Sequence, residues 1–141
     1  MVMNLYLGGF NGSGGTVFND KTWLLYKKQP DLTTPGPDKI FIFMDEREDA
    51  INWGNFYTDM TGYSPSSPAS YKLADMPGTY HNNACGFSFG DGHSEIKKWR
   101  DSRTCPPVQQ GTLIFDGITE TPSPRNPDVA WLQDHSTRPV R

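Results

Sequence analysis

The stretch FSFGDGHSEIKKW (residues 87–99) predicts a β-hairpin. Asp-Gly between alternating apolar residues is a strong short-range hairpin signal, because glycine accepts the positive φ that such a turn needs. We place the turn at residues 90–92, where it would hold Asp91 and His93 at the tip of a rigid element. The side chains expected to be buried are Phe87, Phe89, Ile96 and Trp99.

A second strand is predicted by the apolar run Ile40–Met44. A continuous β-prone run of this kind is typical of a strand buried on both faces. Its end would carry Asp45 and Glu46 to the edge of the sheet. The 14 glycines and 12 prolines favour short strands and structured loops over long helices. The predicted fold is therefore mainly β (α+β at most), a small antiparallel sheet with long ordered loops.

The length of 141 residues suits one domain with a single core. We expect a compact part over about 1–105 and an extended C-terminal tail over about 106–141. The tail contains a strand candidate at Leu113–Phe115. It also contains a helix start at residues 126–128, where asparagine would cap the helix and proline would take its first position.

Two further segments of the N-terminal part are less specific. The glycine cluster GGFNGSGG (residues 8–15) predicts a loop or wide turn. Residues 17–28 fit either a strand or a short helix, because periodicity alone does not separate the two.

Composition excludes several classes of function. Charged residues make up 21% of the chain and the formal net charge is −3, so the surface has no basic footprint for nucleic acid. No apolar run approaches the ~20 residues that span a bilayer, so we expect no membrane insertion of this chain. The chain as given carries no targeting signal, because its N-terminus lacks the basic region and apolar stretch of a signal peptide. Nucleotide-binding, zinc-finger and serine-hydrolase motifs are also missing.

Two cysteines, Cys85 and Cys105, are too few for a disulfide scaffold. They could pair in an oxidising compartment. The predicted hairpin places Cys85 opposite Lys97, so the chain after Trp99 would have to fold back for the pair to form. We favour two free thiols.

Acidic residues cluster directly after the second predicted strand, in MDEREDAIN (residues 44–52). Carboxylate and amide oxygens at a sharp turn can converge on one point, which is what calcium requires, although the spacing does not match an EF-hand. The alternative is a solvated acidic loop whose charge Arg47 partly offsets. The candidate calcium ligands are Asp45, Glu46, Asp49 and Asn52.

Histidines bracket the predicted hairpin. His81 lies upstream of the inbound strand, whereas Asp91 and His93 lie at the opposite, turn end. We therefore expect His81 to make a structural hydrogen bond, which is the common role of a lone histidine. The enzymatic alternative is a small metal-dependent hydrolase of esters, lactones or glycosides. In it calcium would polarise a carbonyl oxygen and His81 or His93 would act as general base. Alternatively, paired carboxylates such as Asp45 and Asp91 could serve glycoside hydrolysis.

Aromatic residues in the irregular stretch after the acidic cluster offer a third class of function, a carbohydrate- or partner-binding module. Such a module would take a small-molecule or glycan ligand. The alternative for these side chains is ordinary loop packing. The residues are Trp53, Tyr57 and Tyr63.

The segment YHNNACGFSFGDGHSEIKKW contains a histidine, nine intervening residues and then Asp-Gly. It resembles the defining motif of the prepilin-type processing-associated proteins named for that spacing, which are pseudopilin-like. Other segments resemble the family in the same order along nearly the whole chain. They are MNLYLGG, PDKIFIFMDEREDAINWGNF, DMPGTYH, WRDSRTCPP and NPDVAWLQDHST.

The resemblance implies a globular domain of a type II secretion or pilus-like system, with other pseudopilin subunits as partners and a periplasmic or extracellular location. Members normally begin with a processed leader and a long apolar helix. This chain shows neither, so we expect it to correspond to the C-terminal globular part. The related major pseudopilins of type II secretion carry calcium in a loop of their C-terminal sheet. The resemblance therefore favours calcium binding, although no ligand residues carry over.

Overall fold

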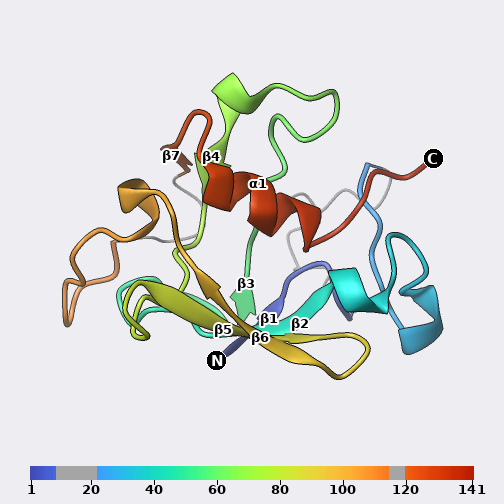
Figure 1. Cartoon of the computed structure of the whole chain (residues 1–141), viewed down its shortest axis with the longest axis horizontal. Helices are drawn as coiled ribbons and strands as arrows, with labels where there is room; N and C mark the ends of the chain where they lie inside the picture. Colours follow the sequence, from blue (N-terminus) through green and yellow to red (C-terminus); the bar gives the residue numbers. More distant parts are fainter. Residues whose placement is uncertain (9–21, 115–119) are drawn as a thin grey trace.

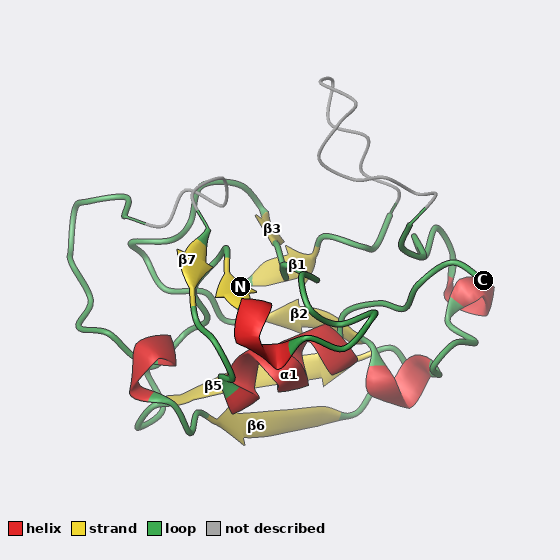
Figure 2. Ribbon diagram, turned by 90° about the horizontal axis from the view of Figure 1, so that it is seen from above, coloured by secondary structure: helices red, strands yellow, loops and turns green. Residues whose placement is uncertain are grey.

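The computed structural model describes residues 1–8, 22–114 and 120–141. In this part of the chain five strands form one mixed sheet in the order β3-β1-β2-β5-β6, and α1 lies over one of its faces (Figures 1 and 2). The strands of this sheet are β1 (Val2–Asn4), β2 (Phe41–Met44), β3 (Asn55–Phe56), β5 (Ala84–Phe89) and β6 (Ser94–Lys98). The prediction of a mainly β fold is confirmed.

Smaller elements connect and cover the sheet. A two-stranded antiparallel sheet pairs β4 (Lys72–Leu73) with β7 (Thr121–Pro122). The single helix of the described residues, α1, spans Pro127–Asp134. Short 3-10 turns occupy Gln29–Asp31, Pro37–Lys39, Pro68–Ser70 and Ser102–Thr104.

The β5–β6 hairpin forms as predicted. The Phe89 amide donates to the His93 carbonyl at 2.9 Å, and the Gly92 amide donates to the Phe89 carbonyl at 3.0 Å. Gly92 has φ +94°, the left-handed conformation that the Asp-Gly signal requires. Cys85 pairs with Lys97 in the register expected from the turn.

The buried set of the hairpin is only partly as predicted, because the expectation for Ile96 is wrong. Side chains in a strand alternate between faces, so Ile96 and Trp99, three positions apart, point to opposite sides. Trp99 is buried in the core, whereas Ile96 pairs with Gly86 on the outer face and is 70% exposed.

The prediction that β2 is buried on both faces is also wrong. Phe43 is 42% exposed, although Phe41 and Met44 are fully buried. A bulge between Phe41 and Phe43 shifts the pairing with β5. The sheet is mixed rather than antiparallel throughout, because β1 runs parallel to β3 while it pairs antiparallel with β2.

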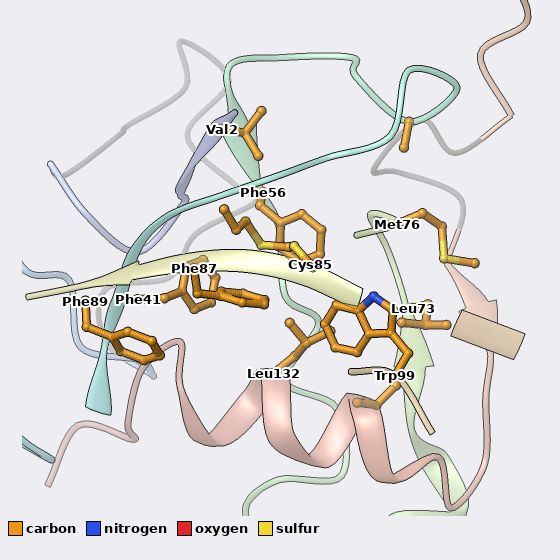
Figure 3. Close-up of a cluster of buried hydrophobic side chains, with 13 residues drawn as sticks. Val2, Phe41, Phe56, Leu73, Met76, Cys85, Phe87, Phe89, Trp99 and Leu132 are labelled. Carbon is orange, nitrogen blue, oxygen red and sulfur yellow. The ribbon is translucent and has the colours of Figure 1, made fainter. Parts of the chain in front are cut away.

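The core lies between the inner face of the sheet and α1 (Figure 3). Val129 and Leu132 of α1 are 1% and 2% exposed and pack with Phe87 and Trp99 of the hairpin. Helix α1, which falls within the stretch expected to be a C-terminal tail, therefore supplies part of the core. A contiguous apolar cluster of this kind is what makes a segment part of the domain.

Helix α1 begins as the sequence predicts. The Asn126 side chain accepts a hydrogen bond from the Asp128 amide at 2.8 Å, and Pro127 takes the first helical position. The predicted strand at Leu113–Phe115 does not form at residues 113 and 114, and residue 115 lies outside the described residues.

The remaining N-terminal predictions are only partly testable. Residues 9–21, which hold most of the glycine cluster and the start of the 17–28 segment, lie outside the described residues. Residues 22–28 contain neither strand nor helix, only single bridges at Trp23 and Tyr26. Among the described residues, no helix has the length and apolar character needed to cross a membrane.

Candidate functional site

The acidic loop after β2 is organised around a buried ion pair. The Arg47 guanidinium donates to both carboxylate oxygens of Asp49 at 2.5 and 2.6 Å, and both side chains are 0% exposed. Arg47 also donates to the carbonyls of Pro106 and Pro107, at 2.7 and 3.0 Å. The Gln109 amide donates to Asp49 at 2.8 Å. Asp49 therefore fixes the 106–109 segment, and these bonds hold the pKa of its carboxyl below the usual range.

Glu46 is buried rather than presented at the sheet edge. It is 4% exposed, and neither of its carboxyl oxygens has a hydrogen-bond partner among the described residues. Burial, with a further contribution from the negative charge of Asp75, raises the pKa of Glu46 to about 9. Without a bound cation beside it, Glu46 is therefore a neutral acid at pH 7.

Asp45 is the most accessible of the three predicted acidic ligands. Its Oδ2 accepts from the Gly86 amide at 3.3 Å and lies 3.8 Å from Nε2 of His81. The carboxylates of Asp45 and Asp49 thus have different partners, and the Glu46 carboxyl accepts no hydrogen bond from the described residues. No three His, Cys, Asp or Glu side chains gather as a metal-binding group in the described part of the chain. Calcium binding by the set Asp45, Glu46, Asp49 and Asn52 stays a prediction, and Asp49 has a structural role instead.

The histidines lie at the two ends of β5, as expected. His81 precedes the strand, and its side chain is 57% exposed. In place of the expected structural hydrogen bond, the ring makes a distant contact with Asp45. His93 lies at the turn, where its Nδ1 is 2.6 Å from Oδ1 of Asp91 and its ring stacks on Phe89 at 4.3 Å. His81, Asp91 and His93 therefore do not form one catalytic group.

His135, to which the sequence assigned no role, is the most buried histidine. Its Nδ1 lies 2.7 Å from the Trp131 carbonyl, one helical turn earlier, and its ring stacks on Trp131 at 4.1 Å. Burial lowers the pKa of His135. The i, i+4 spacing at the end of a helix was the available signal for this contact.

The two cysteines are free, as favoured from the sequence. Cys85 packs in the core, where burial raises the pKa of its thiol to about 12. A thiol of this kind is an unreactive core side chain at neutral pH.

The three predicted aromatic residues separate in the structure. Trp53 is 58% exposed and lies away from the clefts described below. Tyr57 lines a cleft of about 300 Å³, and Tyr63 supports the wall of the same cleft through an edge-on contact with Trp23 at 6.1 Å. Trp23 was not predicted as a binding residue, because the segment around it contains no recognisable motif. The residues around this cleft are Tyr6, Thr22, Trp23, Leu25, Tyr57, Asp59, Met60, Thr61, Gly62 and Ser64.

Asp59 is the acidic group of this cleft and is 5% exposed. The Thr61 amide donates to its Oδ1 at 2.9 Å. Burial raises the pKa of Asp59, and the negative charge of Glu120 adds to the effect. Glu120 itself is paired with Lys72 at 2.6 Å.

A broad groove follows the other side of α1, along the free edge of β6. Its centre is Lys97, whose ammonium lies 5.4 Å from the Trp131 ring centre and 4.0 Å from Asp128. These contacts satisfy the Lys97 ammonium group.

Comparison with protein-family models, with curated proteins and with solved structures gave no match for this chain.

Proposed function

We propose that this chain is the globular subunit of a pseudopilin-like assembly, in a type II secretion or pilus-like system, and acts by packing against other subunits outside the cytoplasm. The resemblance around the His-nine-residue-Asp-Gly motif suggests the family. The observation that carries the proposal is the outer face of the five-stranded sheet, which the helix and the core leave open (Figure 1).

The register of the sheet determines which side chains share this face. Met3 pairs with Phe43, and Phe43 pairs with Ser88 of β5. Residues directly opposite one another point to the same side, so the outer face carries Phe43 and Ile96, 42% and 70% exposed. Between these two side chains lie small ones, Gly86, Ser88 and Ser94.

A face of this kind suits a helix. The uncovered face of a half-buried antiparallel sheet is normally polar. Here two large apolar side chains stand beside two small ones, Ser88 and Ser94, while the Asp45 carboxylate lies against Gly86. Burying apolar area contributes about 25 cal/mol per Å². The proposed occupant is an apolar or amphipathic helix of a neighbouring subunit.

The hydrolase hypothesis has less support from the geometry. His81 and His93 lie at opposite ends of β5, and the single close histidine–carboxylate pair, His93 with Asp91, is formed by two residues of one turn. Calcium stabilisation, which the resemblance favours, is tested separately below.

Site-specific photo-crosslinking in the native host tests the assembly surface. A benzophenone amino acid replaces Phe43 or Ile96 of the outer face, and Tyr80 or Leu113, exposed at 53% and 51% outside the strands, in control variants. We expect adducts from positions 43 and 96 with a subunit that carries a long apolar N-terminal helix. Equal adduct yields at positions 80 and 113, or no adduct at 43 and 96, would contradict the proposal.

A second readout uses polar substitutions. Phe43→Ser and Ile96→Ser should reduce co-purification with the partner subunit and leave the melting temperature of the isolated chain nearly unchanged, because exposed side chains contribute little to folding. Ser94→Ala on the same face is the matched control.

A further inference from the structure

The cleft around Tyr57 and Asp59 lies apart from the outer face of the sheet and combines features of a ligand site. Its volume, about 300 Å³, is at the lower end of the range of roughly 300–1,000 Å³ typical of small-molecule pockets. A cleft of this size suits a single ring rather than an extended chain. We propose that it binds one neutral sugar unit.

The composition of the wall supports a sugar over other small ligands. Trp23 and Tyr57 provide aromatic surface, against which the C–H face of a pyranose can pack. Thr22, Thr61 and Ser64 line the same cleft and supply hydroxyl groups that both donate and accept. A sugar presents the same combination of an apolar face and a ring of hydroxyls.

Asp59 supplies the orienting group. It lines the cleft, is 5% exposed, receives the Thr61 amide on Oδ1, and lies in contact with the side chains of Tyr57 and Glu120. A buried carboxyl group that faces a cleft accepts hydrogen bonds from ligand hydroxyls, and these are stronger than in water.

The charge of the described lining disfavours an anionic ligand. Among the described residues that line the cleft, one is an acid and none is a lysine, arginine or histidine. The nearby Glu120, which is paired with Lys72 at 2.6 Å, adds a second acidic group beside Asp59. An acidic sugar would meet Asp59 without a compensating cation, so the neutral sugar is favoured.

Hydrogen bonds and ring contacts also hold residues of the cleft wall in place. Gln133 of α1, fully buried, donates through Nε2 to the carbonyls of Asp59 and Thr61 at 2.8 and 3.0 Å. On the opposite wall, Tyr63 contacts Trp23 and lies under the Arg138 guanidinium at 5.5 Å. A preformed wall loses less conformational entropy on binding, and this favours affinity for a small ligand.

The test is an amide NMR titration of the full chain with methyl α-D-glucoside, methyl α-D-mannoside, methyl β-D-galactoside and N-acetylglucosamine. Glucuronate and tetramethylammonium are the charged probes. We expect shifts in residues 57–64 with at least one neutral sugar, at millimolar affinity, and weaker shifts with glucuronate. No shift with any neutral sugar, shifts confined to other residues, or binding of tetramethylammonium alone would overturn the proposal.

Variants assign the binding to the cleft. Trp23→Ala and Asp59→Asn should each weaken sugar binding about tenfold, the size expected when a central contact of a small interface is lost. Asp59→Asn retains an acceptor for the Thr61 amide, so it keeps the proposal testable if Trp23→Ala does not fold. Trp53→Ala, at an exposed aromatic residue outside the cleft, should bind as the original chain does. Equal loss in Trp53→Ala, or full binding in Asp59→Asn, would contradict the assignment.

Discussion

Arg47 and Asp49 form a bidentate ion pair in which neither side chain has any exposed surface. Two residues apart in the loop after β2, they close a short turn and fix the 106–109 segment against it through the Pro106 and Pro107 carbonyls and the Gln109 amide. The desolvation of two buried charges is costly, so the pair depends on having every one of these partners.

Removing one partner of this pair should be strongly destabilising. Arg47→Met leaves Asp49 buried without its cation and should reduce the free energy of unfolding by about 3–5 kcal/mol in chemical denaturation. The double variant Arg47→Met with Asp49→Leu should lose less than the sum of the two single variants. Additive losses would mean that the two side chains do not act as a pair.

The same residue separates a structural role from a calcium ligand. Asp49→Ala should lower the melting temperature equally in calcium and in chelator, because its partner in the structure is Arg47. A ligand bound only to the folded state would add about 2.7 kcal/mol at a hundredfold excess over its dissociation constant. A loss of melting temperature that appears only in calcium would identify Asp49 as a metal ligand. Asp45→Asn is the companion variant for the same comparison.

Glu46 should make stability depend on pH. Its pKa is about 9 in the folded chain against 4.5 as the ordinary value. Between pH 4.5 and pH 9 the Glu46 carboxyl is deprotonated in the unfolded chain but stays protonated in the folded chain. The stability that it contributes is therefore highest below pH 4.5 and falls as the pH rises toward 9. The slope is at most about 1.4 kcal/mol per pH unit. Glu46→Gln should flatten this dependence when unfolding is measured from pH 5 to pH 9. Glu48→Gln, in the same loop, should leave the pH dependence of stability unchanged.

Gly92 should tolerate substitution less well than its neighbour Ser94. An added Cβ at Gly92 would meet nothing within 4 Å, so the cost arises from φ +94° and not from a clash. A β-branched residue in that conformation costs about 1–3 kcal/mol. Gly92→Val should therefore lower the melting temperature clearly, whereas Ser94→Val, at an exposed strand position, should change it little. Equal effects would place the turn elsewhere.

The stability effects of substituting His135 and His81 should follow the burial of the two side chains. His135→Ala removes the stacking on Trp131 and the bond to its carbonyl, and should cost about 1–3 kcal/mol. His81→Ala, at a side chain 57% exposed, should change stability by less than about 0.5 kcal/mol. Thermal unfolding of the two variants measures both effects. A larger loss of stability for His81→Ala than for His135→Ala would mean that His81 has the structural role.

Local patterns in the sequence determined the elements that depend on neighbouring residues. Asp-Gly between apolar residues set the hairpin and its register, down to Cys85 opposite Lys97. Asparagine before proline set the start of α1. These predictions succeeded because the interactions that specify a turn or a cap lie within a few residues.

Tertiary packing decided the rest. The exposure of Phe43 and Ile96 depends on α1 covering only one face of the sheet, and that follows from the burial of Val129 and Leu132. The role of Asp49 depends on Gln109, 60 positions away, and the cleft brings Trp23 to Tyr57 and Asp59. Residue types alone fit a calcium loop and a structural ion pair equally well. Only the path of the chain through space determines which partner each charge meets, because a buried charge is stable only beside the group that compensates it.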